Sequence, residues 1–308
     1  MKKAVIIEHG GGELANQLWN YASIYAYTLE TGFKLENPSF YEYGSMFQIR
    51  RGYVADMLLY SPFRAYRGRR NKLLPKTWRK LYKFWAKFVY ARHPNSVISS
   101  VNSNNQVYYL PPTQMATEDL KRLEIEGQIY FSGWLFRNPR GLEKYRNEIV
   151  EYFKPIEKIK TEVDAFVAQA RKFKHVVGVH IRQGDYKEFK NGAYWIEQTR
   201  VREILDEYLK FSGKTKEEVC FVITSDGKIR TEFFTGLNIL ISPLSAIHDL
   251  FVLSRTDIVL GSDSSFGDFA SYLGNIPHII FKRESVDWNY YFGKNTFFEN
   301  KYCTMVQY

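Results

Sequence analysis

VGVHIRQGDY, residues 177–186, combines the pattern of a buried strand with a polar turn. Residues 176–181 form a short apolar run rich in β-branched side chains, which is typical of such a strand. The run gives way around Gly184 to a turn signal. Ligands of open α/β sheets bind where strands end. This stretch therefore predicts both a strand of the sheet and a candidate site.

The polar residues at the end of this strand are suited to an anionic ligand. His180 and Arg182 are two positions apart, so they share one face for as long as the strand continues. The planar guanidinium of Arg182 fits a phosphate, and Gly184 lets the backbone approach a ligand closely. Asp185 is placed to hold Arg182 in position. A plainer alternative stays open, namely a strand that ends in a polar turn with a local ion pair.

Strand and helix patterns alternate along the second half of the chain. The strand patterns cover residues 176–181, 219–224, 237–241, 257–260 and 278–281, and the helical patterns cover 195–211, 246–254 and 267–273. This alternation predicts βαβ units and a parallel sheet. Near the N-terminus, a strand pattern at residues 4–7 leads through glycines to a helical pattern over residues 16–31. We therefore expect an α/β fold with two Rossmann-like halves, divided near residue 160, and a C-terminal tail over residues 286–308.

Two further loops follow strand patterns of the second half and are expected to meet the Arg182 loop at one sheet edge. In the first, the carboxylate of Asp226 can accept the N1–H and N2–H of a guanine, or it can simply belong to a turn. In the second, Ser264 or Ser265 can cap the helix that follows, before Phe266. A helix N-terminus favours a phosphate, although capping by serine is also common without any ligand.

Composition narrows the class of protein. The chain has 308 residues, 45% of them apolar, a net charge of +10 and only two cysteines. Two cysteines provide neither a disulfide framework nor a zinc site, and they fit a reducing compartment. The apolar run at residues 4–7 is too short for a signal peptide, and no segment is long enough to span a bilayer. We expect a cytoplasmic protein, either free or peripheral on the inner face of the membrane.

One segment is unusually basic. Residues 57–117 contain no Asp or Glu, and residues 64–92 carry eleven Lys or Arg interleaved with aromatic side chains. Residues 76–91 have an amphipathic helical pattern, which is typical of a membrane-surface or partner-binding helix. An insertion helix that packs on its own domain is the alternative. The expected partner of residues 64–92 is an anionic membrane surface, and no nucleic acid is expected.

Several segments together resemble one enzyme family. The residues from His180 to Tyr186 resemble the H-x-R-R-G-D-Y motif of the α-1,2-fucosyltransferases of glycosyltransferase family 11 and of related α-1,6- and protein O-fucosyltransferases, with Gln183 in place of the second Arg. Residues 12–22 resemble the family's N-terminal pattern G-G-L-G-N-Q-x-F-x-Y-A. Residues 249–267 resemble its pattern around N-S-x-F-S. The three segments occur in the family's order.

The resemblance implies a GT-B architecture, in which two Rossmann-like domains with parallel sheets face a cleft. Residues 1–160, with an insertion at about 57–117, would form the acceptor-side domain, and residues 161–285 would bind the nucleotide sugar. The implied reaction transfers fucose from GDP-fucose to a glycan hydroxyl with inversion. The chain has no D-x-D motif, so an arginine and a helix N-terminus would neutralise the diphosphate in place of a metal, and no cofactor is expected.

The candidate site residues follow from these motifs and loops. The expected donor contacts are His180, Arg182, Gly184, Asp226, Ser264, Ser265, Phe266 and Asn16. Arg182 is also expected to act in catalysis, and Glu13 or Asp185 is expected to be the base. Two alternatives stay open: a GT-B transferase that uses another nucleotide sugar, and a non-catalytic basic protein that binds RNA or membrane.

Overall fold

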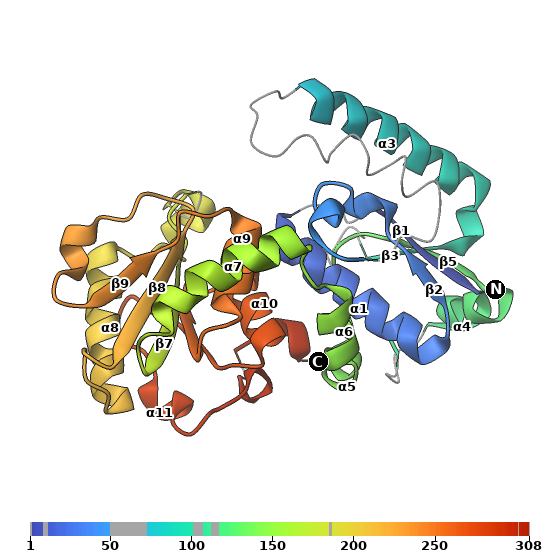
Figure 1. Ribbon diagram of the computed structural model, residues 1–308. Coiled ribbons are helices and arrows are strands. Elements are labelled where there is room, and N and C mark those ends of the chain that lie inside the picture. The colour runs from blue at the N-terminus through green and yellow to red at the C-terminus, as the bar shows by residue number, and fades with distance from the viewer. Residues whose placement is uncertain are drawn as a thin grey trace. The chain divides into compact units, whose positions relative to one another are not determined.

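A computed structural model provides the architecture (Figure 1). It describes residues 2–8, 12–49, 73–100, 107–111, 117–184, 187–300 and 302–307. The chain divides into two compact units: unit 1 is Met1–Ile156 together with Thr304–Tyr308, and unit 2 is Glu157–Cys303. Among the described residues, no helix is both long and apolar enough to cross a bilayer.

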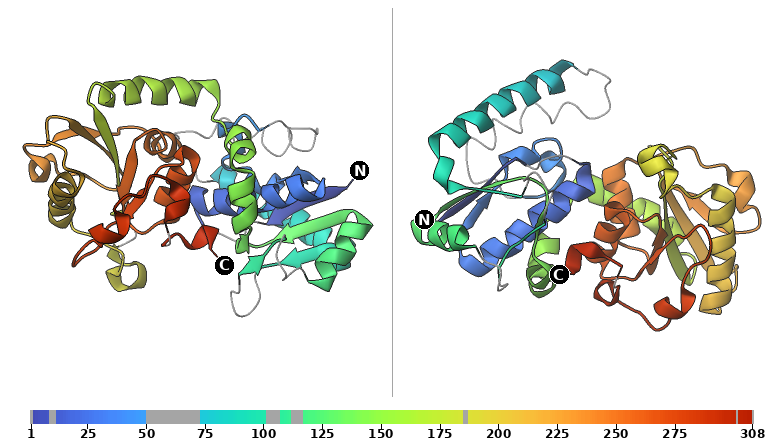
Figure 2. Two further views of the ribbon diagram at one scale, coloured as in Figure 1. Left: turned by 90° about the horizontal axis from the view of Figure 1, so that it is seen from below. Right: turned by 180° about the vertical axis from the view of Figure 1, so that it is seen from behind.

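Unit 1 is built on a four-stranded parallel sheet with the strand order β2-β1-β5-β3. The strands are β1 (Lys3–Glu8), β2 (Lys34–Glu36), β3 (Val97–Ser99) and β5 (Gln128–Ser132). Helix α1 (Leu14–Thr31) lies on one face of this sheet and α3 (Leu73–Arg92) on the other (Figures 1 and 2). The remaining elements are β4 (Tyr108–Tyr109), β6 (Phe136–Arg137), α4 (Glu118–Glu126), α5 (Pro139–Lys144) and α6 (Arg146–Tyr152).

A glycine and a buried asparagine end β5 earlier than the apolar sequence suggests. The apolar run continues to Leu135, but Gly133 adopts a φ of 115°, which favours glycine. The side chain of Asn20 on α1 donates to the Gly133 carbonyl at 3.1 Å and accepts from the Phe136 N–H at 3.2 Å. These bonds turn the backbone out of the sheet. Phe136 then starts β6, which pairs with β4 in a small parallel sheet.

Unit 2 is built on a five-stranded parallel sheet with the order β11-β10-β7-β8-β9. Its strands are β7 (His175–Ile181), β8 (Val219–Ser225), β9 (Asn238–Ile241), β10 (Ile258–Gly261) and β11 (His278–Ile280). Its helices are α7 (Glu157–Ala170), α8 (Gln198–Ser212), α9 (Ala246–Leu253), α10 (Ser265–Gly274) and α11 (Trp288–Tyr291).

Short 3-10 helices occur in both units. They are η1 (Pro38–Phe40), η2 (Gly44–Met46), η4 (Pro94–Ser96), η6 (Phe189–Gly192), η7 (Thr231–Phe234), η8 (Phe297–Glu299) and η9 (Thr304–Val306).

Helices cover both faces of the second sheet. Val177, Val179 and Ile181 of β7 share a core cluster with Ile204 and Leu205 of α8. The opposite face meets α9, and Gly178 is required there because a Cβ at this position would lie 2.8 Å from a methyl group of Leu253. Burial on both faces explains why the strands read as continuous apolar runs.

The strand order places a topological switch point beside β7. The chain runs from β7 outward to β8 and β9, and then crosses to β10 and β11 on the other side of β7. In the register of these two strands, His180 of β7 lies next to Gly261 of β10. Ligands of open α/β sheets bind at such a point, outside the carboxyl ends of the strands.

The segment 286–308 does not form the separate tail that we expected. Val286, Tyr291 and Phe297 are buried in unit 2. The Tyr291 hydroxyl accepts the Ile280 N–H at 3.1 Å, which ties α11 to the edge strand β11. The final residues, 304–308, belong to unit 1. Buried side chains therefore make residues 286–303 part of unit 2.

Candidate functional site

A carboxylate at the end of β8 organises the loop after β7. The Arg182 Nε donates to Asp226 Oδ2 at 3.0 Å. The other oxygen, Oδ1, accepts the backbone N–H groups of Gln183 at 2.7 Å and Gly184 at 3.0 Å. A Cβ at Gly184 would lie 2.9 Å from Asp226 Oδ2, so a side chain at this position would crowd the carboxylate. Asp226 therefore fixes both the loop backbone and the guanidinium.

The partner of Arg182 differs from the one that we expected. The sequence left Asp226 open between a guanine contact and a turn, and it placed Asp185 to hold Arg182. In the structure Asp226 holds Arg182, while Asp185 and Tyr186 lie outside the described residues. The strand register contains the missed signal, because Ile181 pairs with Ser225 and so brings the next residue of each strand side by side.

His180 is a neutral residue beneath this loop. Its side chain is buried, its Nδ1 lies 3.3 Å from the Ser264 hydroxyl, and its ring is 4.9 Å from the ring of Phe266, measured between centroids. Burial, followed by the positive charge of Arg182, lowers the pKa of His180 to about 3. A neutral imidazole avoids a second positive charge beside Arg182, so His180 supports the site without titrating near neutral pH.

The N-terminus of α10 forms the neighbouring wall of the site. Ser264 is the N-cap residue, and its hydroxyl accepts the Gly267 N–H at 3.4 Å, as expected for one of the two serines. Ser265 and Phe266 occupy the first turn and are partly exposed. The backbone N–H of Arg182 donates to the Ser262 hydroxyl at 3.0 Å, and this bond joins the loop after β7 to the loop after β10. The positive end of the helix dipole and the guanidinium thus belong to one cluster of loops.

A buried polar layer below this cluster was missed by sequence reasoning. His278 Nδ1 lies 2.8 Å from Asp268 Oδ1. Within the described part of the chain, neither His278 Nε2 nor the Thr224 hydroxyl has a hydrogen-bond partner. The His278 Nε2 faces Gly267, because a Cβ added at Gly267 would lie 2.8 Å from this nitrogen. The two members of the His–Asp pair come from a strand and a helix, so no local pattern indicates the contact.

The predicted residues of unit 1 gather at the start of α1. Glu13 is the N-cap residue and is exposed, and its Oε2 accepts the Tyr43 hydroxyl at 3.1 Å. Asn16 packs against Gly12, where a Cβ would lie 2.7 Å from its Nδ2. Gly12 also has a φ of 83°, which favours glycine. Gly12 therefore brings the backbone close to Asn16, and the Glu13 carboxylate is accessible.

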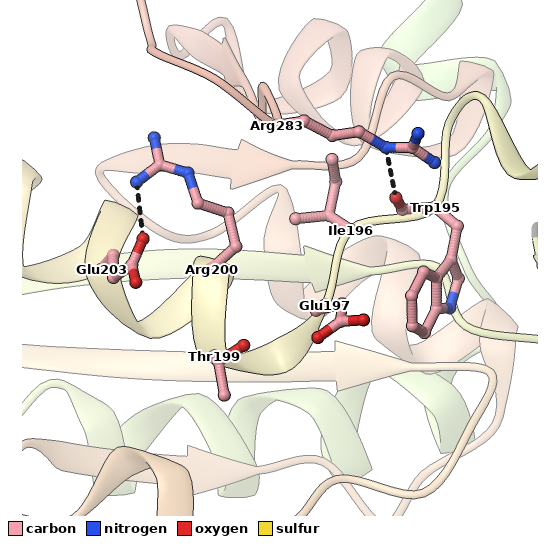
Figure 3. Close-up of a pocket in the computed structure, with 7 residues that line it drawn as sticks. All are labelled: Trp195, Ile196, Glu197, Thr199, Arg200, Glu203 and Arg283. Carbon is pink, nitrogen blue, oxygen red and sulfur yellow. Dashed lines mark hydrogen bonds and ion pairs between the residues drawn. The ribbon is translucent and has the colours of Figure 1, made fainter.

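A pocket of about 430 Å³ lies at the start of α8 (Figure 3). It is lined by Trp195, Ile196, Glu197, Thr199, Arg200, Glu203 and Arg283. Both of its arginines are engaged within the protein: Arg200 bonds Glu207 at 2.6 Å and Glu203 at 3.1 Å, and the Arg283 Nε donates to the Trp195 carbonyl at 3.1 Å. The pocket shares no residue with the Arg182 cluster, although Gln183 Nε2 donates to the Ile196 carbonyl at 3.0 Å.

Comparison with known proteins shows the fold. Neither the protein-family models nor the curated proteins match this sequence. Among solved structures, a mutant of FUT1 from Arabidopsis thaliana in complex with GDP is similar, with a TM-score of 0.51, 14% identity and coverage of 92% of this chain and 72% of that chain. The α-1,6-fucosyltransferase NodZ soaked with GDP-fucose gives a TM-score of 0.53, 15% identity and coverage of 93% and 97%.

A third structure agrees with these two. POFUT1 in complex with GDP-fucose gives a TM-score of 0.56 and 14% identity, with coverage of 91% of this chain and 98% of that chain. The predicted fold class is confirmed: the chain is an α/β protein with a parallel sheet in each unit and the GT-B-type fold of these fucosyltransferases.

Proposed function

We propose that this chain is a glycosyltransferase that moves fucose from GDP-fucose to a hydroxyl group of a glycan. The observation that carries the proposal is the cluster at the switch point of the second sheet, where Asp226 holds Arg182 beside the N-terminus of α10. This cluster is suited to a diphosphate. It occurs in a fold shared with fucosyltransferases solved with GDP or GDP-fucose.

In this proposal, Arg182 and the start of α10 bind the diphosphate of the donor. Negative charge accumulates on the diphosphate as the sugar leaves, and donors that are fixed in advance stabilise it. Asp226 acts as a positioning residue for Arg182. His180, Ser264 and Phe266 support the two loops from below. Because the positive charge is supplied by the protein, the transfer is proposed to need no metal.

The proposed reaction inverts the configuration at the anomeric carbon. The acceptor oxygen attacks the fucose C1 from the side opposite the diphosphate, the bond between C1 and the phosphate oxygen breaks, and its electron pair leaves with GDP. The proton of the acceptor hydroxyl passes to a general base. Glu13 is the proposed base, because its carboxylate is exposed and it directly follows Gly12 at the start of α1.

A donor screen tests the proposal. The purified chain is incubated with GDP-fucose, GDP-mannose, UDP-glucose and UDP-galactose, each with and without a mixture of glycan acceptors, and the release of nucleotide is measured. Among the four donors, we expect only GDP-fucose to release its nucleotide above background. This release should increase when an acceptor is present. Turnover of a different donor would replace the donor assignment. Retention of RNA that falls steeply with salt, without turnover of any donor, would overturn the enzyme assignment.

A further inference from the structure

Helix α3 packs on the first sheet through one side only. Tyr82, Ala86 and Val89 are buried. Val89 shares a core cluster with Val5 and Ile7 of β1, and the Tyr82 hydroxyl donates to the Ile7 carbonyl at 2.6 Å. Figure 1 shows α3 along one face of the sheet, with its other side turned away from the strands. The packed side therefore holds the helix in place without the residues of the outer side.

The outer side of α3 carries a stripe of large apolar side chains, Leu81, Phe84 and Phe88. They are 58%, 75% and 62% exposed, respectively. Their spacing of three and four residues aligns them along the helix. A scattered apolar residue on a surface needs no explanation, whereas a contiguous apolar patch marks an interaction site.

A second stripe, of lysines, runs directly beside the first. Lys80, Lys83 and Lys87 each precede one apolar residue of the stripe, so the two stripes are offset by about 100° around the helix. All three lysines are exposed. No ion pair joins them to any other residue that the structure describes. Residues 57–117 contain no acidic side chain that could neutralise them.

We propose that α3 docks flat on a membrane surface that contains anionic lipids. The apolar and lysine stripes run parallel to the helix axis, so the partner must present an apolar layer beside an anionic layer over the length of the helix. The interface of a bilayer has this arrangement: Leu81, Phe84 and Phe88 enter the acyl boundary, and the lysines reach the headgroups. A nucleic acid matches the lysines but leaves the apolar stripe in water. The proposal does not depend on the transferase assignment.

Vesicle binding of the full chain tests the charge stripe. Co-sedimentation is measured with vesicles of phosphatidylcholine alone and of phosphatidylcholine mixed with phosphatidylglycerol. We expect binding only to the mixed vesicles, and less of it at high salt. Each basic residue near an anionic surface contributes about fivefold to binding. The triple variant Lys80→Glu, Lys83→Glu and Lys87→Glu should therefore bind at least roughly 100-fold more weakly, because it loses three basic residues and its carboxylates are repelled by the anionic lipids.

A matched variant separates the helix from overall charge. Lys172, Lys210 and Lys216 are exposed on unit 2. Their joint change to Glu lowers the net charge by the same amount as the α3 triple variant, and it should preserve most of the binding. If the two triple variants lose binding equally, the attraction comes from net charge and the proposal is wrong.

The apolar stripe has its own test and control. The double variant Phe84→Ser and Phe88→Ser should bind vesicles about tenfold or more weakly, because it lacks the two rings that would be buried in the acyl boundary. Phe292 is 78% exposed on unit 2, and Phe292→Ser should leave binding unchanged. Both natural cysteines are buried, so Phe84→Cys provides an accessible thiol for a polarity-sensitive dye. Its emission should shift to the blue on mixed vesicles, whereas a dye at Ile125→Cys should not respond.

Three further results would overturn the proposal. The first is wild-type protein that ignores anionic vesicles at low salt. The second is unchanged binding after Phe84→Ser and Phe88→Ser. The third is retention on RNA with no retention on vesicles, which would assign the lysine stripe to a nucleic acid. Circular dichroism of each variant checks that its helix content equals that of the wild type.

Discussion

Replacing Arg182 by lysine should reduce turnover severely while leaving the fold intact. Lysine keeps the positive charge, but it has no Nε–H to meet Asp226 Oδ2, which lies 3.0 Å from the Arg182 Nε. It also lacks the planar fork that binds a diphosphate in two places. The bond from the backbone N–H of residue 182 to Ser262 does not involve the side chain, so the loop should keep its course.

The structure separates the expected effect on catalysis from the effect on stability. The Arg182 and Asp226 side chains are 23% and 35% exposed, so their ion pair lies partly in solvent. Such a pair contributes about 0–1 kcal/mol to the free energy of unfolding. Loss of one fixed donor to a developing negative charge raises the barrier by about 2.7–4 kcal/mol, or roughly 10²–10³ in kcat. Turnover should therefore fall far more than stability.

The assay combines GDP release with a double-mutant cycle. GDP release from GDP-fucose is measured for Arg182→Lys, Asp226→Asn and the double variant, and GDP binding and urea unfolding are measured in parallel. If Asp226 acts by holding Arg182, Asp226→Asn should cost little once Arg182 is already lysine. Near-native turnover of Arg182→Lys with normal GDP affinity would refute the assignment of Arg182. Additive effects of the two changes would refute the positioning role of Asp226.

Three further predictions concern the base, metals and pH. Glu13→Gln should lower kcat by roughly 10²–10⁴ without weakening GDP binding, and a wild-type rate in single-turnover measurements would exclude Glu13 as the base. Turnover should survive EDTA, so its loss and recovery with Mg²⁺ or Mn²⁺ would contradict the arginine-based account. Burial raises the pKa of Asp249 from 3.8 to about 7, against the opposing hydrogen bond from Ser242. The folded state therefore binds the proton more tightly, and wild-type stability should fall as pH rises from about 4 to about 7. Asp249→Asn should lack that loss, and the measurement is the difference between the urea unfolding free energies of the two proteins at pH 5 and pH 8.

The second sheet could be predicted from sequence because its strands are buried on both faces. The run at residues 176–181 corresponds to β7 (His175–Ile181), and the run at 219–224 corresponds to β8 (Val219–Ser225). The short strand β2 carries no such signal. β2 (Lys34–Glu36) has a partly exposed, charged sequence, and its place is determined by pairing with β1. The architecture of unit 1 was therefore harder to predict from the sequence than that of unit 2.

Contacts within the candidate site were harder to predict than its location. The loops at the ends of β7, β8 and β10 were expected at one edge because parallel strands end together. Which side chains meet there depends on register, and Asp226 reaches Arg182 only because Ile181 is level with Ser225. A second contact depends on a loop far from Gln183 in sequence: the Gln183 amide donates to the Ile196 carbonyl at 3.0 Å and connects the loop to the start of α8.

The return of the last residues to unit 1 has a consequence for dividing the gene. Unit 2 is one uninterrupted stretch of chain, Glu157–Cys303, and can be excised as a single coding segment. Unit 1 is discontinuous. Its last element, η9 (Thr304–Val306), contacts α5, although all residues of unit 2 lie between the two in the sequence. A stop codon after Cys303 would therefore damage the unit encoded at the opposite end of the gene. A separately expressed unit 1 needs an artificial link from Ile156 to Thr304.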